Sequence, residues 1–327
     1  AATTLALLGG VMLIVLGLIK FGFVANFLSH PVVSGFITAS GIIIALGQLG
    51  PLMGVSIKGD TLPHLLEDLG SHWVDAHGLT TLIGMCAIGF LLFSRYALTS
   101  LLMASGMSER AASLFVRGAP VVIMVVVIPL SYLQGFAEQG VPVVGSVPTG
   151  LPAFSNPHLD WVLLEELAMP AFLIALIGFV ESVSVGKTLG AKRRQRIDPN
   201  QELIGLGAAN TAAALSGGFP VTGGFSRSVV NFDAGADTQM ASIFTAAGIA
   251  LAALLLTPAL YFLPKAVLAA TIIVAVLALI DWNILKLSAR FSRADLSAVL
   301  LTILVTLLAG VELGVLTGVG VSIGLHL

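Results

Sequence analysis

One arginine, Arg227, stands inside an apolar stretch, directly after a break rich in proline and glycine. The break reads Pro-Val-Thr-Gly-Gly-Phe-Ser and begins at Pro220. Apolar and small residues precede it in 205–215, and an apolar run resumes at Ile243. An isolated charge at bilayer depth costs about 2.5–3.5 kcal/mol even on lenient insertion scales. We therefore expect Arg227 to face a cavity or a partner rather than lipid.

The same break predicts a helix that begins inside the membrane. One proline and two glycines prevent a continuous helix, so a new helix is expected to start near Gly224 and Phe225. Its free N–H groups and the positive end of its dipole then point into the gap, which suits an anion. The predicted substrate-binding residues are Gly223, Gly224, Phe225, Ser226 and Arg227.

A carboxylate, Glu181, lies about halfway along another apolar run, 170–189. Low dielectric disfavours the charged form of a carboxylate, so Glu181 is a candidate for binding a proton or a cation and for coupling it to transport. A structural pair of Glu181 with Lys187 or Arg227 is the alternative interpretation. The predicted supporting residues of the cavity are Ser184, Lys187 and Asn210.

The composition indicates a membrane protein. Apolar residues make up 57% of the chain and charged residues 10%, against about 25% charged in soluble domains. With a net charge of −2 and no basic face, a nucleic-acid partner is not expected. The loop 56–77 carries histidines and acids, but their spacing matches no zinc signature, so we predict a solvated loop with a short amphipathic helix and no metal. No catalytic triad, phosphate loop or cofactor motif is found, so an enzyme is not expected.

Apolar runs predict about eleven membrane helices, several of them short for a straight span. They are 4–19, 31–49, 79–93, 119–133, 170–189, 202–216, 224–232, 242–256, 266–280, 296–309 and 313–325. A surface segment, 160–168, is expected to precede the fifth run. If Lys20 is cytoplasmic, nearly all loop arginines and lysines fall inside and only Lys58 and Lys265 fall outside. A multi-pass protein of an inner or plasma membrane is predicted.

Several long motifs, in order along the chain, resemble the SulP (sulfate permease) family of anion transporters. They are GFVANFLSHPVVSGFITA at 22–39, FVESVSVGK at 179–187, NQELIGLGAAN at 200–210, GGFSRSVVN at 223–231 and LPKAVLAA at 263–270. The family includes plant proton–sulfate symporters, bacterial dicarboxylate and bicarbonate carriers, and animal anion exchangers.

The resemblance implies an all-α polytopic fold of fourteen helices in two inverted seven-helix repeats, divided into a core and a gate domain. This chain would begin at the fourth family helix and end in the fourteenth, without the first three helices and without the cytoplasmic STAS domain. Residues 1–30 and 160–260 would belong to the core, which carries the broken helix and the anion site. Residues 31–159 and 261–327 would belong to the gate.

The resemblance also implies a function. In the family the anion lies between the N-termini of the third and tenth helices, and the tenth corresponds here to the residues from Gly224 to Arg227. Sodium-binding members have an acid followed one turn later by a hydroxyl, whereas Val185 follows Glu181, which favours protons. We therefore expect a secondary active transporter with an elevator mechanism, taking up sulfate or a related inorganic or carboxylate anion with protons. A homodimer formed through the missing cytoplasmic part or the gate is expected.

Other functions stay open. They are an uncoupled exchanger or channel for bicarbonate or chloride, a sodium-coupled bicarbonate carrier, a nucleobase carrier and, least favoured, a membrane enzyme. Small residues would support sliding contact between core and gate, although ordinary helix packing explains any one of them equally well. These residues are Gly35, Gly41, Gly178, Gly205, Gly207, Gly314 and Gly318.

Overall fold

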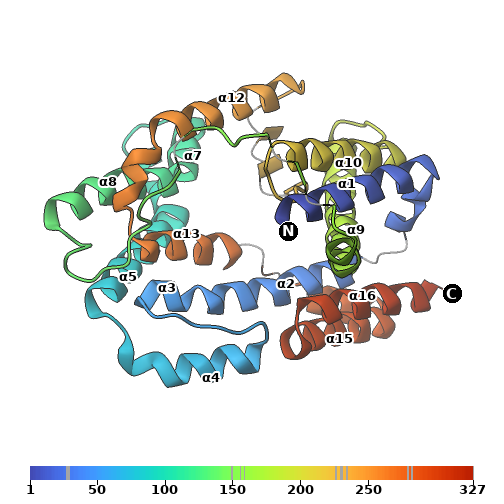
Figure 1. Cartoon of the computed structure of the whole chain (residues 1–327), viewed down its shortest axis with the longest axis horizontal. Helices are drawn as coiled ribbons and strands as arrows, with labels where there is room; N and C mark the ends of the chain where they lie inside the picture. Colours follow the sequence, from blue (N-terminus) through green and yellow to red (C-terminus); the bar gives the residue numbers. More distant parts are fainter. Residues whose placement is uncertain are drawn as a thin grey trace. The chain divides into compact units, whose positions relative to one another are not determined.

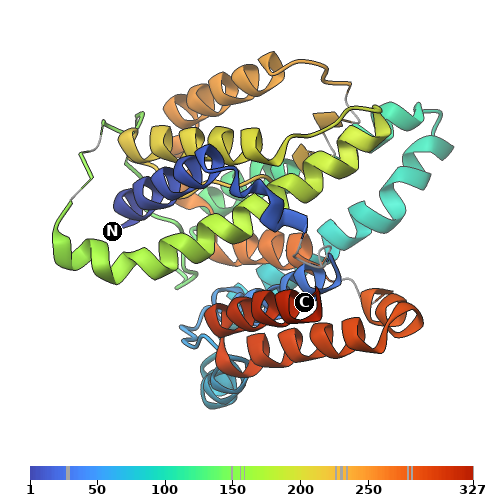
Figure 2. The ribbon, with the colours of Figure 1, turned by 90° about the vertical axis from the view of Figure 1, so that its right-hand side faces the viewer.

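The computed structural model describes residues 1–26, 30–148, 150–154, 156–157, 159–224, 227–228, 231–232, 235–277, 280 and 283–326 (Figures 1 and 2). These residues form helices joined by loops, and no β-strand occurs among them. An antiparallel bridge between Val143 and Pro264 pairs two short stretches of extended backbone. The predicted all-α fold is therefore confirmed.

The chain divides into two compact units, each built from segments far apart in the sequence. Unit 1 comprises Ala1–Val32, Gly150–Ala253 and Val315–Leu327, and unit 2 comprises Val33–Thr149 and Leu254–Gly314. The sequence placed core and gate boundaries at residues 30, 159 and 260, and it placed the last stretch in the gate. The assignment of one unit as core and the other as gate stays a prediction.

Unit 1 consists mainly of α1 (Ala2–Leu18), α9 (Trp161–Lys192), α10 (Pro199–Leu215) and α12 (Met240–Leu255), and α16 (Val311–His326) lies partly in it. Unit 2 contains most of α2 (His30–Gly47), then α3 (Leu49–Met53), α4 (Leu62–His72), α5 (Gly78–Phe93), α6 (Thr99–Ala104), α7 (Glu109–Arg117) and α8 (Ala119–Gln134). Its later helices are α13 (Lys265–Leu277), α14 (Asn283–Phe291) and α15 (Arg293–Ala309). Helix α4 is the amphipathic helix expected in the loop 56–77.

Among the described residues, three helical stretches are long and apolar enough to cross a membrane: Ser34–Met53, Gly78–Ala104 and Trp161–Lys192. A pair bent by 54°, Ala111–Arg117 with Ala119–Gln134, would make a fourth. Shorter apolar helices are Ala2–Leu18, Met240–Leu255, Lys265–Leu277 and Asp295–Ala309. Fewer helices thus reach full span length than the number of apolar runs suggested, because several of those runs form short helices.

The surface segment expected at 160–168 is not separate from the following span. Helix α9 is continuous from Trp161 to Lys192 and includes Pro170. Proline removes one backbone donor and crowds the preceding turn, yet such a residue is tolerated in membrane helices whose neighbours satisfy the freed groups. The prediction of a separate surface segment was therefore wrong, because its residues form the first turns of α9.

Unit 1 is held together by a close crossing of α1 and α10, which lie side by side next to α9 (Figures 1 and 2). A Cβ atom on Gly10 would lie 2.9 Å from the carbonyl oxygen of Gly207. In turn, a Cβ atom on Gly207 would lie 2.7 Å from the carbonyl oxygen of Gly10. Only hydrogen at both positions lets the two backbones touch, so the crossing depends on this glycine pair.

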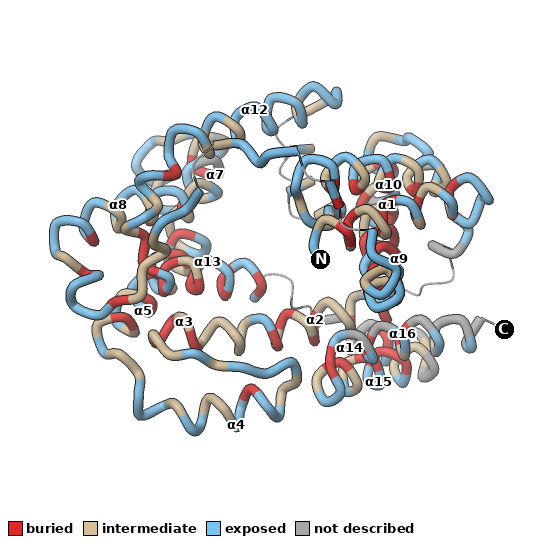
Figure 3. Tube along the Cα trace, in the orientation of Figure 1, coloured by how far each residue is buried: buried red, intermediate tan, exposed pale blue. Residues whose placement is uncertain are grey.

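Unit 2 is organised around α13, whose residues are largely buried (Figure 3). Val267, Ala270 and Ile273 of α13 belong to one apolar cluster with residues of α5 and α8, including Ala87 and Ile123. Because α13 contacts α3, α5 and α8, it ties the two ends of unit 2's sequence into one body.

Five of the seven small residues predicted for sliding contact have close neighbours within their own unit. Gly178 and Gly207 have their close neighbours in unit 1, on Thr222 and on α1. In unit 2, Gly35 approaches Val299, Gly41 approaches Val276 and Gly314 approaches Thr306. Gly205 would meet nothing within 4 Å, so its prediction as a close-packed position was wrong. Ordinary packing explains the five residues that have close neighbours.

The glycine pair predicts unequal effects of one substitution on α10. Gly207→Ala forces the α1 backbone away and should lower the free energy of unfolding by about 1–3 kcal/mol, as overpacking does. The matched control, Gly205→Ala, adds its methyl group to open space and should gain up to about 1 kcal/mol of helix propensity. Thermal unfolding in detergent measures both, and equal stability of the two variants would contradict the backbone contact.

Candidate anion site at a broken helix

The helix break predicted from the sequence is present. Helix α10 ends at Leu215, and Gly217 adopts a left-handed φ of 75°, which a residue with a side chain rarely tolerates. The N–H of Gly218 donates to the carbonyl of Ala213 over 2.7 Å and so closes the helix end. From Gly218 to Gly224 the chain is not helical.

Asn210 of α10 pairs with the backbone of this extended segment. Its side-chain oxygen accepts from the N–H of Val221 at 2.9 Å, and its amide nitrogen donates to the carbonyl of Val221 at 2.8 Å. The same nitrogen also donates to the carbonyl of Leu206 at 2.9 Å. Asn210 is 4% exposed, whereas Val221 is 39% exposed, so the amide lies on the inner side of the segment. One amide therefore satisfies both backbone groups of Val221, as a neighbouring strand would.

Helix α9 holds the next two residues of the segment. The hydroxyl of Thr222 donates to the carbonyl of Gly178 at 3.0 Å, and the N–H of Gly223 donates to the hydroxyl oxygen of Ser182 at 3.0 Å. Gly178 and Ser182 are one helical turn apart, so a single face of α9 receives both bonds. The extended segment is thus fixed from two sides, by α10 and by α9.

Two glycines allow this close approach. A Cβ atom on Gly178 would lie 2.9 Å from the hydroxyl of Thr222, and one on Gly223 would lie 2.7 Å from the hydroxyl of Ser182. Any larger residue at either position must push the segment off α9. Gly223 was predicted to bind substrate, and this stays a prediction. Its contacts with Ser182 fix the extended segment to α9.

A helical turn starts at Gly224. The N–H of Ser228 donates to the carbonyl of Gly224 at 3.1 Å, which is the first bond of an α-helix, and residues 227–228 and 231–232 are helical. Of the predicted residues in this turn, Phe225 and Ser226 lie outside the described residues. The predicted helix start near Gly224 is present.

The guanidinium of Arg227 lies beside this helix start. A Cβ atom on Gly224 would be 3.4 Å from Nε and 3.6 Å from Nη2 of Arg227. The Arg227 side chain is exposed within the described structure. A cation therefore stands next to the end of the helix whose dipole is positive, and both favour an anion in the same place.

The residues that follow the short helix are held at the end of α9. Arg193, just beyond α9, lies 2.9 Å from the carboxylate of Asp237 and donates to the carbonyl of Ala236 at 3.0 Å. Its guanidinium is 4.7 Å from the ring centre of Phe232. Sequence reasoning placed Arg193 only among cytoplasmic basic residues, because charge counting gives no partner for a particular arginine.

A cavity of about 680 Å³, lined by both polar and apolar residues, lies in unit 1 between α9 and α10. Gly223 and Ser228 line it at the helix start, Ser182 and Val185 line it on α9, and Glu202 lines it on α10. The Glu202 carboxylate was missed by sequence reasoning, since it lies near the start of an apolar run and resembles an ordinary first-turn acid.

The other predicted residues take different positions. Glu181 is half-buried on α9, one residue before Ser182, whereas Ser184 and Lys187 are exposed. Asn210 does not stand in the large cavity but is buried beneath the extended segment, where it pairs with Val221.

Solved structures share the fold of this chain. SLC26A9 matches with a TM-score of 0.88 at 24% identity, over 99% of this chain and 50% of that chain. The transmembrane domain of the cyanobacterial bicarbonate transporter BicA matches with a TM-score of 0.74 at 22% identity, over 98% of this chain and 76% of that chain. At these identities the likeness establishes the fold alone.

The sequence itself establishes the family. The family model described as the sulfate permease family matches residues 1–306, so the chain belongs to the sulfate permease family, as its motifs predicted. Sulfate transporter 4.1, chloroplastic, of Arabidopsis thaliana is 32% identical over 92% of this chain and 42% of the relative. Sulfate permease 2 of Neurospora crassa is 33% identical over 84% of this chain and 34% of that relative. The chain thus spans about a third to two fifths of the length of these two relatives.

The pairing of Asn210 with Val221 predicts a stability change on α10. Asn210→Leu removes the hydrogen bonds to the N–H and the carbonyl of Val221, which costs about 0.5–1.5 kcal/mol for each bond. The control Thr211→Val removes a hydroxyl whose hydrogen bond, to Gly207, lies within its own helix, and should cost no more than about 1 kcal/mol. Thermal unfolding compares the two variants. If Asn210→Leu is no less stable than Thr211→Val, Asn210 does not hold the segment.

Proposed function

We propose that this chain is the transport part of a secondary active anion carrier and that the anion binds where the short helix begins at Gly224. The observation that carries the proposal is the helix start fixed on α9 and α10 with the guanidinium of Arg227 beside it. The names of the relatives, which are sulfate transporters and sulfate permeases, support a small oxyanion as the substrate.

Each predicted residue has a role in this proposal. Gly223 and Gly224 provide the turn into the helix, and the backbone N–H groups of Phe225 and Ser226 donate to the anion. The planar fork of Arg227 donates two further bonds and matches an oxyanion better than a point charge does. Asn210 acts indirectly, by fixing Val221 within the segment. Ser184 and Lys187, exposed on α9, extend the polar surface beside the site.

We assign the coupling role to Glu181. It is half-buried on the helix that also holds Gly223 through Ser182, so a change in its charge acts close to the bound anion. Protons are favoured over sodium because Val185, one turn later, offers no oxygen ligand. In this proposal the protein works as a proton–anion symporter in an inner or plasma membrane.

The elevator mechanism assigns unit 1 as the moving core and unit 2 as the gate. Unit 1 contains all described residues of the proposed site, and its helices are joined by backbone contact at Gly10 and Gly207. A body fastened in this way can move without disturbing the site. The expected homodimer is part of the same proposal and would form through the gate or through cytoplasmic parts.

A second function is uncoupled exchange of bicarbonate or chloride. It is favoured by the fold neighbours, which are titled as a bicarbonate transporter and, for murine Slc26a9, an anion transporter. Uptake of radiolabelled sulfate, bicarbonate, chloride and dicarboxylate into proteoliposomes of the full-length gene product separates the two. Proton-coupled sulfate or carboxylate uptake that rises with outside acidity supports the first, and bicarbonate or chloride exchange that ignores the pH gradient supports the second.

Arg227 provides the direct test of the anion site. Arg227→Ala should abolish saturable sulfate binding in calorimetry, and Arg227→Lys should restore it only in part, because an ammonium group lacks the planar fork. The control is Arg196→Ala, which removes an exposed arginine in the loop between α9 and α10 and should bind normally. Unchanged affinity in Arg227→Ala would exclude the site.

Glu181 provides the test of coupling. Glu181→Gln mimics the protonated side chain, so it should keep exchange of substrate for substrate while losing accumulation driven by a pH gradient. Glu165→Gln, at an exposed position near the start of α9, serves as the control and should accumulate substrate as the wild type does. If Glu181→Gln still concentrates substrate down a pH gradient, coupling resides elsewhere.

A further inference from the structure

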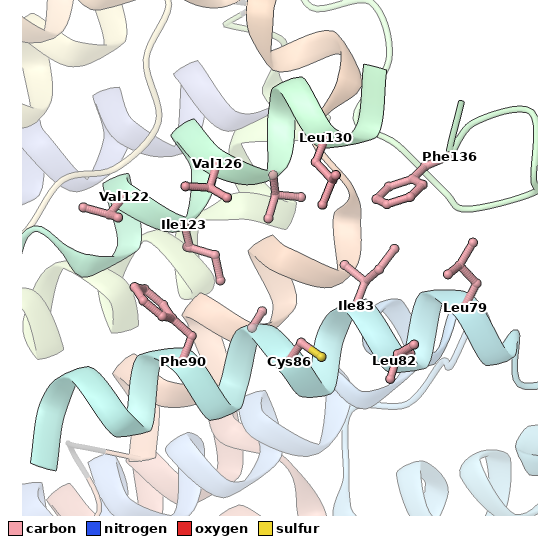
Figure 4. Close-up of a pocket in the computed structure, with 12 residues that line it drawn as sticks. Leu79, Leu82, Ile83, Cys86, Phe90, Val122, Ile123, Val126, Leu130 and Phe136 are labelled. Carbon is pink, nitrogen blue, oxygen red and sulfur yellow. The ribbon is translucent and has the colours of Figure 1, made fainter. Parts of the chain in front are cut away.

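Unit 2 contains an apolar groove of about 420 Å³ between α5 and α8 (Figure 4). Side chains of these two helices form its walls, and Phe136 follows α8 at one end. Phe90 lies at the other end, beside Ile123. Apart from the thiol of Cys86, every lining side chain is a hydrocarbon, so the groove offers a ligand no hydrogen-bonding side chain.

The groove has a fixed floor and an open side. Ala87 and Ile123 form the floor, are 2% and 7% exposed, and belong to the apolar cluster of unit 2. Leu82 and Val126 form the rim and are 60% and 59% exposed. Helix α5 is part of Gly78–Ala104, a stretch long and apolar enough to cross a membrane, so an exposed apolar rim on it suits the hydrocarbon of a bilayer better than water.

The length of the groove matches one leaflet. Leu79 and Phe90 line its two ends on α5, and at 1.5 Å per residue they are separated by about 16 Å along the helix. Half of a hydrocarbon core is about 15 Å thick. Leu79 follows the polar N-cap residue His77 almost directly, so the groove begins at the edge of the membrane and ends near its middle.

We propose that this groove binds one acyl chain of a membrane phospholipid, whose headgroup lies at the membrane surface near the start of α5. The volume falls within the range of small-molecule sites, about 300–1,000 Å³. The chain of a lipid is the ligand that combines an apolar body of leaflet length with one polar end at the surface. Because the floor belongs to the core of unit 2, a bound chain completes the packing of α8 against α5.

The first test is retention of lipid through purification. Val126→Trp fills the groove from its rim, whereas Val125→Trp places the same side chain at a neighbouring position that is 64% exposed and outside the groove. Native mass spectrometry of the full-length protein in detergent should show one bound phospholipid fewer in Val126→Trp than in the wild type and Val125→Trp. Equal lipid counts in all three proteins would overturn the proposal.

The second test uses Cys86, the only cysteine in the sequence. In delipidated protein, palmitoyl-oleoyl phosphatidylglycerol added at ten times its dissociation constant should slow alkylation of Cys86 by roughly tenfold. Val125→Trp should show the same protection. Alkylation that the lipid does not slow would contradict an acyl-chain site. Crosslinking of Cys86 between two copies would show instead that a second copy fills the groove.

Discussion

The proposed site depends on hydrogen-bond partners for the backbone groups of a non-helical segment. A stretch of non-helical chain in lipid must find partners for every N–H and C=O group, or each unsatisfied group costs several kcal/mol. In the proposed function the segment from Gly218 to Gly224 is such a stretch. The side chain of Asn210 pairs with both backbone groups of Val221, and the hydroxyl of Ser182 accepts from the N–H of Gly223. The hydroxyl of Thr222 adds a side-chain bond to the carbonyl of Gly178. Without them the short helix could not begin where Arg227 is placed.

Helix α9 and Arg193, which directly follows it, hold the chain on both sides of the short helix. Ser182 holds Gly223 before the short helix, and Arg193 holds Ala236 and Asp237 after it. An exposed ion pair alone contributes little, about 0–1 kcal/mol, but here the guanidinium also contacts a carbonyl and the ring of Phe232. Glu181 lies on the same helix, so the proposed coupling residue and the proposed anion site would move as one body.

The sequence was informative where local chemistry decides the outcome. The break before Gly224 follows from proline and glycine, and most helix boundaries follow from where apolar runs end. It was uninformative where a residue's role depends on a distant partner. Nothing local distinguishes Gly207, which touches α1, from Gly205, which touches nothing, and nothing predicts that Asn210 pairs with Val221. The sequence also did not show that residues 160–168 join α9, because that helix continues through Pro170, where proline usually interrupts a helix.

The fixed segment is proposed to present an anion site at Gly224 and Arg227. An anomalous-scattering map of the protein crystallised with selenate, which replaces sulfate with a heavy scatterer, tests this site. A peak is expected at hydrogen-bond distance, about 2.7–3.2 Å from selenate oxygen to nitrogen, from the Arg227 guanidinium and from the backbone N–H groups after Gly224. Selenate bound reproducibly elsewhere, with this helix start empty, would contradict it.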